Sequence, residues 1–144
     1  MTMTVHVDIV SAEKEIFSGL AEMLFAPAQM GEVGISPRHA PFITRLNPGE
    51  VRVKVSDKEY YPFFVSGGIL EVQPYLVTVL ADTAIRAKDI DEAAALTAKA
   101  KAEEVLADKS GKVDYEAAHV QLLQAIMQLR TLDRLKKRGV SGGH

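Results

Sequence analysis

The sequence predicts an α+β protein, mainly β, in which an N-terminal β-sandwich of about ten short strands precedes a C-terminal antiparallel two-helix hairpin. Two observations support this prediction. Between Val5 and Ala81, short apolar segments rich in Val, Ile and Phe recur at near-regular spacing, separated by Gly, Pro, Asn and Ser. After Arg86 the hydrophobic period changes from that of a strand to that of a helix. We therefore expect a β-sandwich over residues 1–86 and a helical hairpin over residues 87–144.

The composition is that of an ordinary globular protein, with 47% apolar and 25% charged residues among 144. A net charge of -2 gives no electrostatic reason to expect a nucleic-acid partner. The absence of cysteine excludes disulfides, thiolate catalysis and zinc–thiolate sites. Residues 1–10 lack the features of a signal peptide, and no apolar run approaches the roughly 20 residues that span a bilayer. We expect no direct insertion into a membrane.

The first strand is predicted by Val5, Val7 and Ile9, which alternate with polar residues at a period of two. Pro27 is expected to stop the third strand, and Pro62 is expected to lie at an edge or a bulge, because proline cannot donate to a ladder. The remaining strands are expected at residues 15–17, 21–26, 42–46, 51–55, 60–66, 69–73 and 76–81.

The pair Gly67-Gly68 lies between two apolar, β-prone runs. Glycine takes positive φ without steric cost, as a tight two-residue hairpin turn requires. We therefore expect the flanking strands to form a hairpin within a meander, and Ser66 to have a structural role, since no nucleophile motif surrounds it.

Residues 28–41 are expected to be mainly loop, with a short strand possible around Val33. Long loops on a rigid sheet are frequent binding surfaces. His39 lies in this loop, and two interpretations remain open: its ring packs against or caps the loop, or it contacts a partner.

The first helix is expected to begin with a capping box formed by Asp89 and Glu92, and to end at Ser110-Gly111. Asp114 can cap the second helix. The alanine-rich first helix predicts a thin seam, so the hairpin must either pack on something or move. The second helix carries one apolar stripe, formed by Tyr115, Ala118, Leu122, Ala125, Leu129 and Leu132, with Ile126 beside them.

Five cations near the end of the second helix are opposed by Asp133 alone: Arg130, Arg134, Lys136, Lys137 and Arg138. They could be a solvated last turn, where the helix dipole favours positive charge. They could equally be a patch for an acidic partner surface.

The residues show no catalytic constellation. The histidines His6, His39, His119 and His144 lack metal-ligand spacing, and Gly31 and Gly34 belong to no phosphate-binding loop. With 6% aromatic residues and no Trp, the chain is poorly equipped for stacking sugars or bases. We expect an interaction module without cofactor or metal rather than an enzyme.

Several segments resemble one family in order and spacing along nearly the whole chain. They are residues 10–19, residues 31–35 with 39–41 and 48–53, and residues 64–74 with 77–84. The chain resembles the ε subunit of bacterial F-type (proton-translocating) ATP synthase.

The resemblance implies a non-catalytic central-stalk subunit. Its sandwich would grip the γ subunit and stand on the c-ring, coupling proton-driven rotation to ATP synthesis in the catalytic head. Its hairpin would switch between a form folded on the sandwich and an extended form that inhibits ATP hydrolysis. The subunit would be peripheral, on the cytoplasmic face of the bacterial inner membrane.

The resemblance also assigns residues. The cationic group would meet an acidic segment of the β subunit in the inhibited state, in which the α subunit is also a partner. This favours the partner-patch interpretation. Glu32 would be the main polar contact of the ring-facing loop, whose residues are Gly31, Glu32, Val33, Gly34, Ile35, Arg38 and His39.

Two departures from the family pattern affect these expectations. Some relatives bind ATP through a motif of which Ile90 and Asp91 remain, but Ala94 stands where arginine is needed, so we expect weak or absent ATP binding. Arg38 stands where glycine is usual; it is strained if φ is positive there, and otherwise adds a charge to the ring face.

The alternative function is a free-standing nucleotide-sensing module that uses the hairpin.

Overall fold

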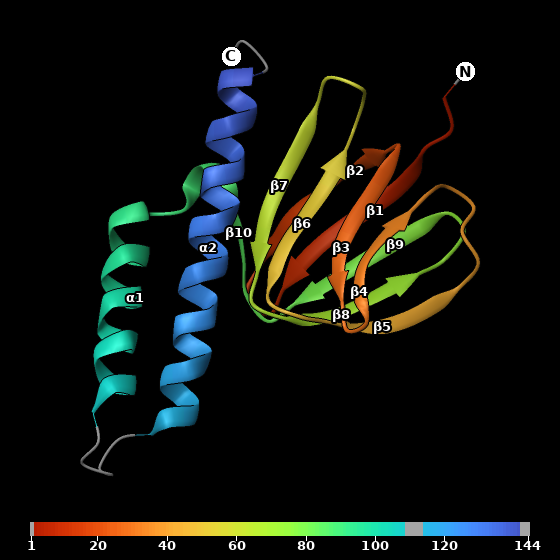
Figure 1. Cartoon of the computed structure of the whole chain (residues 1–144). Helices are drawn as coiled ribbons and strands as arrows, with labels where there is room; N and C mark the ends of the chain where they lie inside the picture. The colour runs from red at the N-terminus through yellow and green to blue at the C-terminus, as the bar shows by residue number, and fades with distance from the viewer. Residues whose placement is uncertain (1, 109–113, 142–144) are drawn as a thin grey trace.

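In residues 2–108 and 114–141, with side chains as far as residue 136, the computed structural model shows a ten-stranded β-sandwich with a two-helix hairpin along one side (Figure 1). This confirms the predicted fold class. The strands are β1 (Val5–Ser11), β2 (Glu15–Ala21), β3 (Met23–Ala28), β4 (Gly31–Ile35), β5 (Phe42–Leu46), β6 (Gly49–Lys54), β7 (Tyr60–Val65), β8 (Gly68–Val72), β9 (Leu76–Ala81) and β10 (Ala84–Arg86).

The strands form two layers that share one corner. One layer contains β4, β3, β6, β7 and β10, and the other contains β5, β8, β9, β1 and β2. A single pairing, Ala28 with Leu46, joins β3 to β5 at the corner. The ladders are antiparallel except that of β1 with β9, which is parallel.

The inward-facing residues, which alternate with outward-facing residues along each strand, fill the space between the layers. Val5, Val7 and Ile9 are buried, as their period of two predicted. Among the described residues, every buried member of this core lies between Val5 and Ala81, and none belongs to the hairpin. Each large aliphatic side chain buried in this way stabilises the fold by about 1.5–3 kcal/mol.

Gly67 and Gly68 have φ of +127° and +139°, as expected of a turn, but the predicted hairpin is wrong. Strand β7 pairs with β6 and β10, whereas β8 pairs with β5 and β9. The glycine pair therefore carries the chain from one layer to the other. A Cβ on Gly68 would also collide with the carbonyl oxygen of Leu80, so close packing requires glycine there in addition to φ.

Two predicted strand ends are also wrong. Strand β2 continues past Phe17 to Ala21, because β1 pairs with it along its whole length. Pro27 lies inside β3 rather than ending it. The ladder of β3 with β6 stops at Phe25, so the missing N–H of Pro27 leaves no gap on that side. Pro62 lies just beyond the ladder of β7 with β10, which confirms the predicted edge position.

The C-terminal part begins with the 3₁₀ turn η1 (Ala87–Asp89) and continues with the helices α1 (Glu92–Ala107) and α2 (Tyr115–Ser141). The residue that caps α1 is Asp91, whose Oδ1 accepts a hydrogen bond from the Ala94 N–H at 3.1 Å, and not Asp89, which belongs to η1. Asp114 caps α2 as expected, accepting from the Ala117 N–H at 3.0 Å. The predicted stop at Ser110-Gly111 lies outside the described residues.

The seam of the hairpin is thin, as the alanine content predicted. Its buried residues are Ala95 and Ala102 on α1 and Ala118 and Ala125 on α2. Alanine allows the two helices to approach closely but buries little area. The predicted stripe on α2 holds except at its start, where Tyr115 is exposed.

Helix α2 lies between α1 and the sandwich (Figure 1). Its Leu132 packs against Phe64 of β7, Ala87 of η1 and Ile90, and together they form a small second cluster separate from the main core. The hairpin is therefore folded against the sandwich through a small apolar contact.

Candidate interaction surfaces and the hairpin–sandwich junction

The segment predicted to be a ring-facing loop is largely a strand. Residues Gly31–Ile35 form β4, which pairs with β3. The short strand that the sequence allowed around Val33 is therefore present, and the remainder of residues 28–41 is mainly loop. Glu32 projects from this strand with its side chain 51% exposed. Its Oε1 accepts a hydrogen bond from Nη2 of Arg52 at 2.9 Å. The predicted polar contact is thus accessible, but it is already paired within the chain.

Arg38 is the non-glycine residue with positive φ, 64°, in the described part of the chain. Its strain is offset by a hydrogen bond from its N–H to the Pro74 carbonyl at 3.0 Å, and by a guanidinium that lies 4.8 Å from the centre of the Tyr75 ring. The strained alternative is therefore correct, and the added charge is held against an aromatic ring.

His39 makes local contacts. Its Nδ1 lies 2.8 Å from the Ala40 carbonyl oxygen, and its ring centre lies 5.3 Å from that of Phe42. These contacts favour the loop-capping interpretation. Arg38 and His39 follow the Ile35 end of β4, whereas Glu32 lies near its Gly31 end, so the structure places these candidates at opposite ends of one strand.

The hairpin cations are not one free patch in this conformation. Nη1 of Arg134 lies 3.4 Å from Oε1 of Glu50 on β6, and Nζ of Lys136 lies 2.7 Å from Oε2 of Glu92 at the start of α1. Among the described side chains, Arg130 makes no ion pair or hydrogen bond. The side chains of Lys137 and Arg138 lie outside the described residues.

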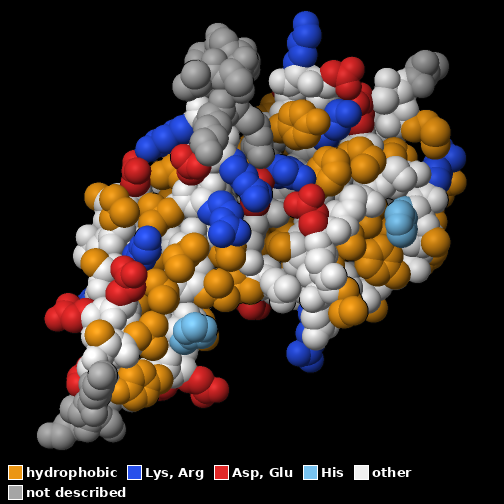
Figure 2. Space-filling model, viewed as in Figure 1, with side chains coloured by type: hydrophobic (Ala, Val, Ile, Leu, Met, Phe, Trp, Pro, Cys, Tyr) orange, Lys and Arg blue, Asp and Glu red, His pale blue; other side chains and the backbone are white. Residues whose placement is uncertain are grey.

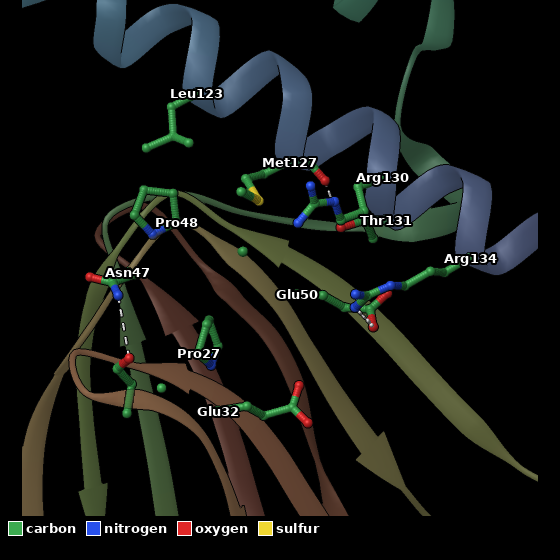
Figure 3. Close-up of a pocket in the computed structure, with 13 residues that line it drawn as sticks. Pro27, Glu32, Asn47, Pro48, Glu50, Leu123, Met127, Arg130, Thr131 and Arg134 are labelled. Atoms are coloured by element: carbon green, nitrogen blue, oxygen red, sulfur yellow. Dashed lines mark hydrogen bonds and ion pairs between the residues drawn. The ribbon is translucent and has the colours of Figure 1, made fainter.

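Cations and acids gather where α2 crosses the sandwich (Figure 2). The junction holds a cavity of 410 Å³, and its walls include Pro27, Pro48, Met127 and Arg130 (Figure 3). The cavity shows that α2 is not closely packed along its whole length. The docking of α2 therefore depends on the small apolar cluster and on the Arg134–Glu50 pair.

Glu50 is a functional candidate that the sequence analysis missed. Its side chain is only 4% exposed, and it faces two arginines, because Nε of Arg52 also lies 3.7 Å from its Oε1. A buried carboxylate requires such partners. The sequence contained one indication of this site. Glu50 and Arg52 are two residues apart, which places opposite charges on one face of a strand.

The remnant of the nucleotide motif has structural roles here. Ile90 is buried in the cluster under α2, and Asp91 caps α1. The groove between the two helices is lined by three glutamines, two alanines, Val105 and a single cation, Lys101. One cation is a poor match for a triphosphate, which supports the expectation of weak ATP binding.

Other predicted positions have local structural explanations. Ser66 Oγ accepts hydrogen bonds from the Thr83 N–H at 3.0 Å and from the Thr83 hydroxyl at 2.7 Å, so it fixes the chain before β10. Within the described residues, no group of His, Cys, Asp or Glu side chains is arranged to hold a metal ion. In the same part of the chain, neither helix is sufficiently long and apolar to cross a membrane.

Comparison with known proteins identifies the family. A family model described as "ATP synthase, Delta/Epsilon chain, beta-sandwich domain" matches residues 4–87, and one described as "ATP synthase, Delta/Epsilon chain, long alpha-helix domain" matches residues 88–133. The ATP synthase epsilon chain of Nitrosococcus oceani is 64% identical over 138 residues, which cover 96% of this chain and 99% of that protein. ATP synthase epsilon chain 1 of Methylococcus capsulatus is 64% identical over 137 residues, covering 95% and 98%.

The fold is also found in distant solved structures. A chain of the Euglena gracilis mitochondrial ATP synthase, described as OSCP/F1/c-ring, superposes with a TM-score of 0.69 at 17% identity, covering 93% of this chain and 80% of that one. A chain of the Tetrahymena thermophila mitochondrial ATP synthase, central stalk/c-ring, gives a TM-score of 0.58 at 14% identity, covering 91% and 98%. The two matched domains and the near full-length relatives show that this chain belongs to the ATP synthase epsilon-chain family.

Proposed function

We propose that this chain is a non-catalytic central-stalk subunit of a bacterial F-type ATP synthase. In this role the sandwich contacts the γ subunit and the c-ring, and it couples proton-driven ring rotation to ATP synthesis in the catalytic head. The complex holds the chain on the cytoplasmic face of the inner membrane. The observation that carries the proposal is the similarity to an ATP synthase epsilon chain over 96% of this chain at 64% identity.

An exposed apolar face of the sandwich supports a role in binding a partner. On the outside of the layer that contains β5, β8 and β9, the side chains of Ile43, Ile69 and Leu80 are exposed, and Ile69 lies opposite Leu80 in the ladder. Neighbouring apolar side chains exposed on a rigid sheet are typical of an interface. We assign this face to the γ subunit.

We also propose that the hairpin inhibits ATP hydrolysis when it leaves the sandwich and presents its cations to an acidic segment of the β subunit. In the folded form, Arg134 and Lys136 are engaged by Glu50 and Glu92. These cations cannot serve both sets of partners at once. The thin apolar contact under α2 supports a bistable element, because neither position is held firmly.

Co-expression with the γ subunit tests the central-stalk role. The full chain should co-purify with γ, and Leu80→Glu should weaken this association by placing a charge in the apolar face. Val120→Glu on the hairpin is the matched control, since Val120 and Leu80 are exposed to almost the same extent, 51% and 50%. A wild-type chain that does not retain γ contradicts the role. Equal retention by both variants contradicts only the assigned face.

A further inference from the structure

A row of four alternating charges joins strand β4 to helix α2. Glu32 on β4 pairs with Arg52 on β6 at 2.9 Å, and Arg52 Nε lies 3.7 Å from Glu50 Oε1. The same Oε1 of Glu50 lies 3.4 Å from Nη1 of Arg134 on α2. Figure 3 shows Arg134 reaching Glu50 from the helix, while Glu32 lies on β4, which is separated from β6 by β3. The row thus connects the ring-facing candidate to the hairpin.

The guanidinium of Arg52 lies between the carboxylates of Glu32 and Glu50, and it does not hydrogen-bond to both of them. Its Nη2 donates to Glu32, while its buried Nε makes no hydrogen bond to any described residue. The guanidinium lies 4.7 Å from the centre of the Phe25 ring, which supports it from one side. A small turn of the group would convert the 3.7 Å contact with Glu50 into a charge-assisted hydrogen bond.

Burial of Glu50 makes this exchange important for the movement of α2. Its side chain is 4% exposed, whereas that of Arg134 is 44% exposed and can return to water. Removing one partner of a buried ion pair is strongly destabilising when the remaining charge is left uncompensated. Arg52 is placed to compensate the charge of Glu50 after Arg134 departs. The free energy of releasing α2 therefore depends on whether Arg52 is held by Glu32 or is turned toward Glu50.

We propose that Arg52 is an exchangeable cation that couples the contact made by Glu32 to the release of α2. When a hydrogen-bond donor or cation of a partner engages Glu32, Arg52 turns toward Glu50 and weakens the hold of Glu50 on Arg134. By thermodynamic reciprocity, release of α2 makes Glu32 more available to that partner. The biological use of the coupling rests on the proposed function, whereas the coupling itself belongs to the isolated chain.

A single cysteine can report the release of α2, because the natural chain has no cysteine. Thr131 is 1% exposed and lies on α2 beside the cavity at the junction, and its hydroxyl donates to the Met127 carbonyl of its own helix. Thr131→Cys therefore places a thiol, in a side chain of similar volume that lacks the threonine methyl group, where folding of the hairpin hides it. When the helix closes faster than a maleimide reacts, the labelling rate is proportional to the open population.

In the full-length T131C chain at low salt, Glu32→Gln should raise the labelling rate at least about fivefold, a typical coupling between linked sites. Arg52→Gln should slow labelling, since it removes the cation that would compensate Glu50 when Arg134 leaves. In the Arg52→Gln background, Glu32→Gln should have no further effect. Glu71→Gln, which removes an exposed carboxylate of the other layer, is the matched control and should change nothing.

If Arg52→Gln unfolds the chain, as judged by circular dichroism, Arg52→Met is used as the background. Methionine keeps an apolar stem beside Phe25 but carries no charge that could be exchanged between Glu32 and Glu50. An unchanged rate in Glu32→Gln, or an increase that persists in the Arg52 backgrounds, overturns the coupling. Because the assay contains no other subunit, its failure is independent of whether the chain binds γ.

Discussion

At the scale of single residues, two glycines share a backbone conformation but differ in their surroundings. Gly31 has φ of +128° and Gly68 has φ of +139°, both rarely adopted by residues with a side chain. A Cβ on Gly31 would meet no atom within 4 Å, whereas one on Gly68 would collide with the Leu80 carbonyl. Comparing substitutions at Gly31 and Gly68 therefore separates the free-energy cost of backbone strain from the cost of disturbing the contact between β8 and β9.

Gly68→Ala should lower the free energy of unfolding by about 3 kcal/mol or more, because strain and collision act together. Gly31→Ala should lower it by only about 1 kcal/mol, because strain acts alone. Urea denaturation followed by circular dichroism measures both values. Equal losses would mean that the close approach of β8 to β9 relaxes without cost, which would contradict the requirement for glycine at position 68.

At the scale of the element, α2 uses one set of side chains in two competing ways. Its Arg134 holds the folded form through Glu50 and is also a member of the proposed inhibitory patch. The two partners of this ion pair should therefore behave differently when each is neutralised. The difference between the two variants shows whether the ion pair holds α2 in the folded form or whether Arg134 acts only as a surface charge.

Glu50→Gln should increase inhibition of ATP hydrolysis in the assembled complex, because it loosens α2 and leaves every cation in place. Arg134→Gln should decrease inhibition, because the loosened helix then lacks a cation that the acidic partner needs. Since Arg134 is partly exposed, we expect the pair to contribute only about 1 kcal/mol. ATPase rates of the reconstituted complexes measure both effects. The same direction of change in both variants would show that the Arg134–Glu50 pair does not hold α2 in the folded form. The double variant should show the same decrease in inhibition as Arg134→Gln.

The elements also show where sequence patterns suffice. The strand at residues 42–46 and the cap at Asp114 were predicted correctly, because alternation and capping are local properties. The cap of α1 was assigned to Asp89 rather than Asp91, since both acids precede alanine-rich sequence and only the turn at η1 distinguishes them. Local patterns predict that an element exists more reliably than they predict its ends.

At the scale of the whole molecule, the errors concern contacts between distant segments. The parallel pairing of β1 with β9 and the crossing of the chain at Gly67 depend on the completed sandwich, which no short window contains. The candidate site shows the same limit. Glu32 was assigned by resemblance and the hairpin cations were found from their spacing along the helix, whereas Glu50 was missed because its partner Arg134 lies 84 residues away in the chain.

The separation of the two apolar clusters leads to a prediction for the whole molecule. The main core lies between Val5 and Ala81, and α2 covers a second cluster around Phe64. A chain that ends at Arg86 should therefore keep a folded sandwich, at a cost of about 1.5–3 kcal/mol for exposing Phe64. It should still bind γ, and the complex should hydrolyse ATP faster than the complex with the full chain.

Three measurements on the shortened chain separate the outcomes. Circular dichroism reports whether the sandwich is folded, co-purification reports the association with γ, and the ATPase rate reports inhibition. A folded chain that binds γ without raising the ATPase rate would show that the hairpin does not inhibit. A folded chain that no longer binds γ would show that the hairpin takes part in assembly, and the exposed face at Leu80 would then be insufficient as the γ contact.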